Sequence, residues 1–213
     1  MNIEGAIFDL DGTLLDSMGI WDSLGETYLL KKNITPAGDL RETVKALSLQ
    51  QAAHHFREHY GISDDEETII AEVTSQVADF YRHEAALKDG VVECLAKLKG
   101  RQVKMCIATA SERELVEVAL KRLGILDYFS GILTTNEVRA GKDSPLIFQN
   151  AVEKMGVSIA ATVVFEDALH AVETAVGAGF RVVGVHDDSA HQDSARIKAL
   201  TEQYIYSFSE WKG

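Results

Sequence analysis

After Gly90 the chain alternates short, β-favouring apolar runs with segments of helical periodicity, and this alternation limits its possible folds more than any other feature. Strands are expected at residues 5–10, 103–109, 131–134, 162–165, 181–185 and, at an edge, 204–206. Helices are expected at residues 91–99, 112–123, 145–155 and 168–178. Strands that alternate with helices favour a parallel sheet covered on both faces. The sequence therefore predicts an α/β fold with a doubly wound parallel sheet.

Residues 18–84 have a different composition, because they are polar, rich in Gln, Glu, His and Ala, and contain few strand candidates. The acidic run from Asp64 to Glu67 is typical of a helix N-terminus, and Ile69, Val73 and Val77 then recur at helical spacing. From these residues alone, the stretch is either a set of further helices in the same domain or an inserted helical domain.

The charge balance limits the classes of partner. The formal net charge is -12 at pH 7, with a pI near 5.0, whereas binding to nucleic acid or to a membrane surface needs a cationic face. No apolar run approaches the roughly 20 residues of a membrane-spanning helix, and the N-terminus lacks the basic and apolar regions of a signal peptide. We therefore expect a cytoplasmic protein with no nucleic-acid or membrane partner.

Cys94 and Cys106 lie in apolar segments and are expected to be reduced core thiols. No heptad repeat stands out, so a monomer is expected.

Polar groups follow several of the expected strands. They are Asp9 and Asp11 at the C-terminal end of the first strand, Thr109 and Ser111 at the end of residues 103–109, and Glu166 and Asp167 after residues 162–165, with Lys142 in a loop before a helix. Ligands of parallel α/β sheets bind beyond the carboxyl ends of the strands, so these groups should converge at one edge. Clustered carboxylates repel each other unless a cation lies among them, and Mg²⁺ prefers hard oxygen ligands. The arrangement indicates metal-assisted phosphoryl transfer.

The segment Asp9–Ser17, which reads DLDGTLLDS, resembles the first motif of the haloacid dehalogenase-like hydrolase superfamily. The similarity extends, in order and spacing, to Thr109, Lys142 and the run Phe165–Asp167. Each residue alone has an ordinary explanation as a turn, a helix cap or a solvated charge, and their joint occurrence carries the resemblance. It implies a Rossmann-like core of residues 1–17 and 86–213 and a small all-helical cap domain of residues 18–85. The branch it points to is that of β-phosphoglucomutase-like proteins and sugar-phosphate phosphatases.

The resemblance also implies roles for individual residues. Asp9 is the expected nucleophile, which forms an aspartyl-phosphate, and Asp11 is the expected general acid/base. Thr109 is expected to bind the phosphoryl oxygens with the backbone N–H groups near Ala110 and Ser111. Lys142 is expected to neutralise charge on Asp9 and on the phosphoryl group.

The cofactor that the resemblance implies is Mg²⁺. Its expected ligands are the carboxylates of Asp9 and Asp167 and the backbone carbonyl of Asp11. Glu166 is expected to support the metal through water or a hydrogen bond to a ligand.

The resulting hypothesis is a magnesium-dependent phosphatase for a small organic phosphate monoester, such as a sugar or sugar-alcohol phosphate. Asp11 argues against a dehalogenase, because a halide leaving group needs no proton. A β-phosphoglucomutase-like mutase stays an alternative. Two features disfavour it, because Trp21 stands where those mutases carry a histidine and residues 46–50 lack their Gly-x-Ser-Arg segment.

Three other interpretations are weaker. A phosphonatase would need a buried cap lysine, and nothing in the sequence marks Lys31, Lys32 or Lys45 as buried. A non-catalytic phosphate sensor would not need Asp11. His55 and His59 share a helix face, but without a third ligand a solvated face is favoured over a zinc site.

Overall fold

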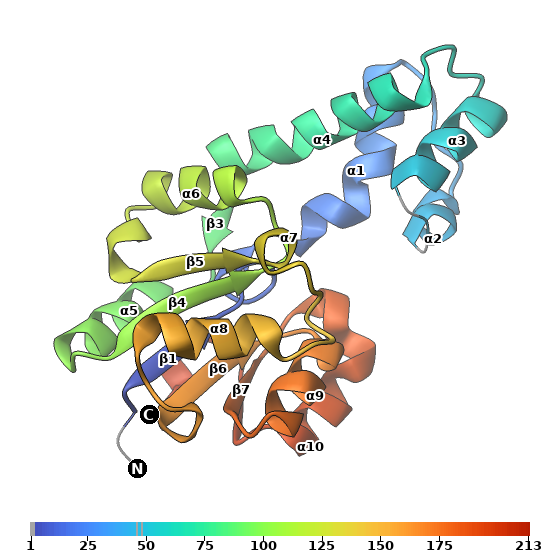
Figure 1. The fold of residues 1–213 in the computed structure, drawn as a ribbon. Coiled ribbons are helices and arrows are strands. Elements are labelled where there is room, and N and C mark those ends of the chain that lie inside the picture. The colour runs from blue at the N-terminus through green and yellow to red at the C-terminus, as the bar shows by residue number, and fades with distance from the viewer. Residues whose placement is uncertain (1–2, 46, 48) are drawn as a thin grey trace. The chain divides into compact units, whose positions relative to one another are not determined.

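The computed structural model describes residues 3–45, 47 and 49–213, and it divides the chain into two compact units (Figure 1). One unit contains residues 1–17 and 85–213, and the other contains residues 18–84. We call them the sheet unit and the helical unit and describe each by itself.

The sheet unit contains a six-stranded sheet in the order β5-β4-β1-β6-β7-β8, in which every pair of neighbours is parallel. The strands are β1 (Gly5–Phe8), β4 (Lys104–Thr109), β5 (Gly131–Thr134), β6 (Thr162–Glu166), β7 (Arg181–Val185) and β8 (Gln203–Ile205). β1 lies between β4 and β6, so the end of the first strand is at the centre of the sheet. The predicted α/β fold with a parallel sheet is confirmed.

The helices of the sheet unit follow the predicted alternation. They are α5 (Val91–Gly100), α6 (Arg113–Arg122), α7 (Thr135–Val138), α8 (Leu146–Met155), α9 (Leu169–Gly177) and α10 (Ser194–Leu200). Short 3₁₀ turns occupy Leu126–Tyr128, Ile159–Ala161, Asp188–Asp193 and Phe208–Glu210. Pro145, which was expected inside the first turn of α8, is instead its N-cap. The prediction omitted α7 and α10, which are both shorter than the periodic windows on which it rested.

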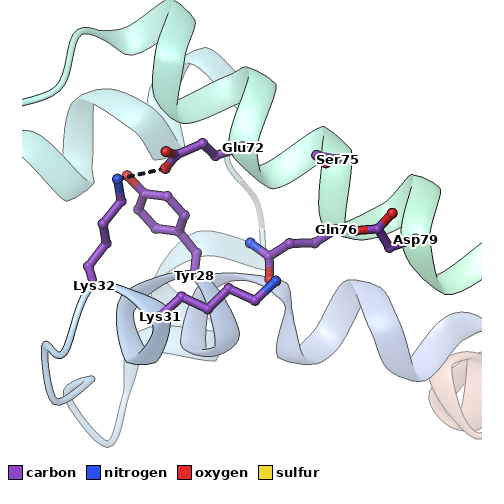
Figure 2. A pocket seen from close by; sticks show the side chains of 7 residues that line it. All are labelled: Tyr28, Lys31, Lys32, Glu72, Ser75, Gln76 and Asp79. Carbon is purple, nitrogen blue, oxygen red and sulfur yellow. Dashed lines mark ion pairs between the residues drawn. The ribbon is translucent and has the colours of Figure 1, made fainter.

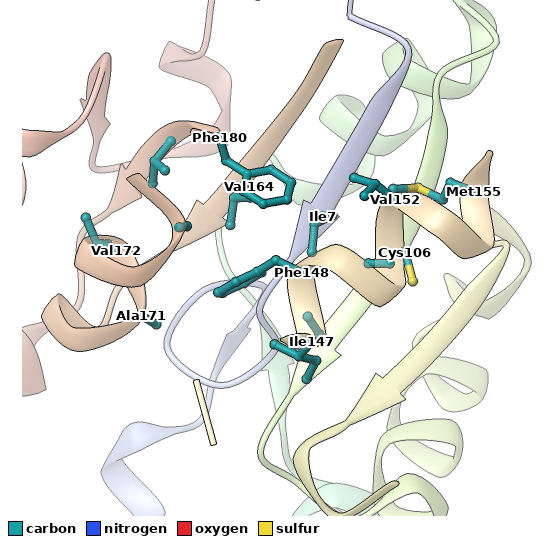
Figure 3. Packing of buried hydrophobic residues seen from close by; sticks show 14 of the residues in the cluster. Ile7, Cys106, Ile147, Phe148, Val152, Met155, Val164, Ala171, Val172 and Phe180 are labelled. Atoms are coloured by element: carbon teal, nitrogen blue, oxygen red, sulfur yellow. The ribbon is translucent and has the colours of Figure 1, made fainter. Parts of the chain in front are cut away.

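Both faces of the sheet are packed because side chains alternate along each strand. Ile7 of β1 and Val164 of β6 belong to a cluster with Ile147 and Phe148 of α8 (Figure 3). On adjacent positions of the same two strands, Phe8 stacks on Phe165 with ring centroids 4.6 Å apart. The apolar contacts on both sides fix the two central strands, and with them the residues that follow each strand.

Both cysteines are buried free thiols, as predicted. Burial raises the pKa of Cys94 to about 12 and that of Cys106 to about 11. Both thiols therefore stay protonated and unreactive at neutral pH.

The helical unit consists of α1 (Met18–Lys31), α2 (Leu40–Lys45), α3 (Leu49–Tyr60) and α4 (Glu66–His83). Asp65 caps α4, since its carboxylate accepts the Thr68 N–H at 2.7 Å, so the predicted acidic helix start is confirmed. The arguments against a mutase and a phosphonatase rest partly on positions outside the described residues. These positions are the side chains of Trp21 and Lys45 and the residues Ala46 and Ser48. Over the part of the chain that the structure covers, no helix combines the length and the hydrophobicity needed to cross a membrane.

A short antiparallel pair, β2 (Leu15–Asp16) and β3 (Ala86–Leu87), joins the two segments of the sheet unit that flank residues 18–84. The Lys88 N–H extends the pair by donating to the Leu14 carbonyl at 2.9 Å. The sequence analysis missed both strands, because two residues carry no periodicity.

Candidate functional site

Three buried carboxylates meet where β1 and β6 end. Phe8 pairs with Phe165 in the sheet, and the Asp9 N–H donates to the Phe165 carbonyl at 3.0 Å, so the two chains leave the sheet side by side. Asp9, Glu166 and Asp167 each contribute a carboxylate oxygen, and these oxygens lie within 4.8 Å of one another. Their exposed fractions are only 6%, 1% and 4%. We call these three residues the carboxylate cluster.

Lys142, on the loop between α7 and α8, brings one buried positive charge to the carboxylate cluster. Its ammonium forms ion pairs with Asp9 and, at 2.8 Å, with Glu166. Glu166 is itself oriented by the backbone N–H groups of Asp167, at 3.2 Å, and Ala168, at 3.1 Å. The two carboxylates raise the pKa of Lys142 despite its burial, so the lysine stays charged. Glu166 therefore holds Lys142 in place beside Asp9.

The electrostatics of the cluster fit a divalent cation. Burial raises the pKa of Asp9 well above its ordinary value, against the effect of Lys142. Burial and the neighbouring Glu166 raise the pKa of Asp167 to about 7. Within the cluster, one ammonium faces three carboxylates, so two negative charges lack a partner when all three are ionised. One divalent cation supplies this charge, and carboxylate oxygens are suitable ligands for it.

Asp11 lies in a second group of polar side chains that reaches the end of β4. Its carboxylate accepts hydrogen bonds from the hydroxyls of Ser17, at 2.6 Å, and Ser111, at 2.5 Å. Thr109, the last residue of β4, is buried, and its hydroxyl oxygen accepts the Ser111 N–H at 3.0 Å. The structure thus joins Asp11, Thr109 and Ser111, whereas Ala110 is exposed and offers only its backbone.

The loop after β1 contains one glycine that the geometry requires. Gly12 has a positive φ of 83°, and a Cβ atom at this position would overlap the carboxylate of Asp167. The next residue, Thr13, donates its hydroxyl proton to the other Asp167 oxygen at 2.7 Å. Gly12 and Thr13 therefore set the position of Asp167, although they are 155 and 154 residues away along the chain.

Thr13 and Ser17 are polar partners of the site that the sequence analysis did not assign. Thr13 contacts Asp167 and Ser17 contacts Asp11. The available signal was their place in the DLDGTLLDS segment, where two hydroxyl residues accompany the carboxylates. The sequence does not reveal which carboxylate each hydroxyl meets.

We predict that Gly12→Ala weakens cation binding and lowers stability. The alanine methyl group must displace Asp167, and an L-residue at positive φ costs about 1 kcal/mol before that overlap is relieved. The expected result is a lower thermal midpoint and at least a tenfold weaker affinity for a divalent cation, on the order of 1.4 kcal/mol. Thermal unfolding with and without Mg²⁺ measures both. Gly19→Ala is the control, because a Cβ there meets nothing within 4 Å. Unchanged cation affinity in Gly12→Ala would contradict this account of the loop.

The fold and the site together define an α/β protein with a parallel sheet and with a buried centre of carboxylates and one lysine at the carboxyl ends of its central strands. The sequence matches the profile of the haloacid dehalogenase-like hydrolase family over residues 6–185. Since the match covers most of the 213 residues, this chain belongs to the haloacid dehalogenase-like hydrolase family, and the predicted resemblance is confirmed.

Two relatives by sequence are named as phosphatases. The chain is 31% identical over 207 residues to validoxylamine A 7'-phosphate phosphatase of Streptomyces hygroscopicus subsp. limoneus, with 92% of this chain and 94% of that protein covered. It is 28% identical over 198 residues to a phosphorylated carbohydrates phosphatase of Thermotoga maritima, with 86% and 85% covered.

Solved structures agree on the fold. A Thermotoga maritima protein provisionally named as a β-phosphoglucomutase superposes with a TM-score of 0.84 at 24% identity, covering 98% of this chain and 96% of its own. At this level of identity the likeness concerns the fold alone, and it does not separate a phosphatase from a mutase.

Proposed function

We propose that this chain is a magnesium-dependent phosphatase that hydrolyses a sugar or sugar-alcohol phosphate through an aspartyl-phosphate on Asp9. Hydrolysis of a small organic phosphate monoester is the activity that the family and its phosphatase relatives support. The observation that carries the mechanism is the placement of Asp9, buried at the end of the central strand and paired with Lys142.

In the first step an Asp9 carboxylate oxygen attacks phosphorus and the bond from phosphorus to the leaving oxygen breaks. The Lys142 ammonium pairs with Oδ1, and we assign the attack to Oδ2. Burial opposes ionisation of Asp9, and Lys142 favours the ionised form that attack requires. Lys142 would also neutralise charge on the transferring group.

Asp11 handles the protons in both steps. It donates a proton to the leaving alkoxide in the first step, and in the second it takes a proton from the water that attacks phosphorus. The bond between phosphorus and Asp9 then breaks, which releases inorganic phosphate and regenerates both carboxyl groups. The hydroxyls of Ser17 and Ser111 fix the Asp11 carboxylate in one orientation. Thr109 keeps its own hydroxyl proton available to bind a phosphoryl oxygen, because its oxygen accepts the Ser111 N–H.

We assign the cation as Mg²⁺. The carboxylates of Asp9 and Asp167 and the backbone carbonyl of Asp11 would hold it, with Glu166 supporting the site through Lys142 and its backbone contacts. When bound, the ion supplies positive charge to the phosphate oxygens and to Asp9.

We also propose that the helical unit is the cap domain that selects the substrate, and that the enzyme acts as a monomer. The helical unit is an insertion between two segments of the sheet unit. Light scattering of the purified chain tests the monomer.

The test of the function is phosphate release from sugar, polyol, nucleotide and phosphonate compounds, with Mg²⁺ and with excess chelator. We expect release from sugar or polyol phosphates that requires Mg²⁺. The mutase alternative predicts isomerised product without net phosphate, and only after a sugar bisphosphate is added. A sensor predicts saturable phosphate binding with no turnover of any compound. Either result would overturn the proposed phosphatase.

A further inference from the structure

A pocket lies within the helical unit, between α1 and α4 (Figure 2). Its volume is about 330 Å³, at the lower end of the range of about 300–1,000 Å³ found for small-molecule sites. None of its lining residues belongs to the carboxylate cluster or its surroundings.

Two buried polar atoms at this pocket have no hydrogen-bond partner among the described residues. They are the Tyr28 hydroxyl and the Gln76 Oε1 atom. The Tyr28 side chain is 1% exposed and that of Gln76 is 7% exposed. Figure 2 shows both side chains reaching from α1 and α4 into the space between these helices. Buried polar atoms without partners are rare in folded proteins and destabilise them, so these two atoms indicate a missing partner.

Gln76 is unusual for its place on α4. Val73 and Val77, its neighbours on the inward side of the helix, are buried apolar residues. An apolar side chain at position 76 would continue this stripe at no desolvation cost. Glutamine at this position instead places a polar amide among the residues that line the pocket.

The charged residues that line the pocket cancel each other. They are two cations, Lys31 and Lys32, and two anions, Glu72 and Asp79. Lys32 is already paired with Glu72 at 2.8 Å, and Asp79 with Arg82 at 3.4 Å. A strongly anionic or cationic ligand would therefore meet repulsion as well as attraction. A neutral ligand with many hydroxyls avoids this, because each hydroxyl can donate to Gln76 and either donate to or accept from Tyr28.

One water molecule does not account for this pocket. A water takes about 30 Å³ in the liquid, far less than the volume available, so the pocket has room for a ligand of several heavy atoms. A chain of several hydroxyl-bearing carbons can contact the two atoms at separate points.

We propose that the pocket between α1 and α4 binds a neutral polyhydroxylated small molecule of the sugar or sugar-alcohol class, with Gln76 Oε1 and the Tyr28 hydroxyl as its hydrogen-bond partners. The site is distinct from the one that carries the proposed phosphatase activity, and it does not depend on that activity.

The test is a titration of the full-length, ¹⁵N-labelled chain with D-glucitol in excess chelator, followed by NMR of the assigned Gln76 side-chain amide and the backbone amides of α1 and α4. We expect saturable shifts confined to these signals. Tyr28→Phe and Gln76→Leu should each weaken the affinity about fivefold, as expected for the loss of one hydrogen bond. Thr74→Ala, on the exposed side of α4, should leave the affinity unchanged.

Three results would overturn the proposal. They are no saturable shift with D-glucitol, equal shifts in wild type and in both pocket variants, or saturable shifts with inorganic phosphate or glycine but not with D-glucitol. Tyr28→Phe removes one oxygen atom and keeps the ring, so it preserves the test if Gln76→Leu fails to fold. A failed phosphatase assay would leave all of these outcomes readable, because none measures turnover.

Discussion

Asp9→Asn is expected to reduce turnover of the best sugar or polyol phosphate by at least about 10⁴-fold while the protein stays folded. The amide is a poor nucleophile, so the phosphoryl group has no acceptor in the first step. Its carbonyl oxygen can still accept the Lys142 ammonium that pairs with Asp9 in the wild type, so we expect an unchanged circular dichroism spectrum. Steady-state phosphate release under saturating Mg²⁺ measures the loss.

Asp16→Asn is the matched control for that change. Asp16 lies seven residues further along the same motif, and its side chain is exposed on the two-residue strand β2. The same chemical substitution there should leave turnover within about twofold of wild type. Residual turnover above about 1% in Asp9→Asn, with mass spectrometry excluding reversion to aspartate, would remove Asp9 from the role of nucleophile.

The nucleophile and the acid/base can be separated with p-nitrophenyl phosphate, whose leaving group needs little protonation. Asp11→Asn should release about one equivalent of nitrophenol in a rapid burst and then turn over slowly, because Asp9 is still phosphorylated and water is no longer activated. Asp9→Asn should show no burst. A burst in Asp9→Asn, or none in Asp11→Asn, would show that the two roles are assigned wrongly.

The parts of the structure that could be predicted from sequence are those encoded by local patterns. β6 and β7 are apolar runs flanked by helices, and each formed within one residue of the expected bounds. Parallel pairing then places Asp9 beside Asp167, because every strand end comes to the same edge. The carboxylates could thus be located without any knowledge of side-chain contacts.

What could not be predicted depends on long-range geometry. Thr13 meets Asp167, and Ser111 meets Asp11, across 154 and 100 residues of chain, and no local pattern encodes either contact. Glu166 was expected to support the metal, and the contact that the structure adds is its ion pair with Lys142. The sequence analysis did not single out Gln76. Helical periodicity is judged from apolar residues such as Val73 and Val77, and it gives no information about a polar residue between them.

The carboxylate cluster also makes the stability of the metal-free protein depend on pH in a direction that can be tested. In the folded chain the pKa of Asp167 is raised from 3.8 to about 7, chiefly by burial and then by Glu166. Between these two pH values the folded state holds a proton that the unfolded state releases. The contribution of Asp167 to the free energy of unfolding is therefore greatest below pH 4 and is lost as the pH rises towards 7. The loss is on the order of 4 kcal/mol.

Asp167→Asn removes that ionisation and can keep a hydrogen bond from the Thr13 hydroxyl. In excess chelator at pH 8 we expect the variant to be more stable than wild type, with a thermal midpoint raised by about 5–10 °C for a chain of this size. The advantage should shrink as the pH falls and should disappear near pH 4. Mg²⁺ should reverse the order at pH 8, because it stabilises the wild type by binding the folded state and has lost a ligand in the variant.

Asp187→Asn is the control with the opposite sign. Burial opposes ionisation of Asp187, but hydrogen bonds from Lys88, at 2.8 Å, and from Ser189 hold its pKa below the ordinary value. This carboxylate stabilises the fold above its unfolded pKa, and the contribution is lost as the pH falls. Asp187→Asn should therefore destabilise the protein at pH 8 and have little effect in acid. If both variants lower the midpoint at pH 8 in chelator, Asp167 is not a source of repulsion in the metal-free protein, and the argument that the cluster needs a divalent cation fails.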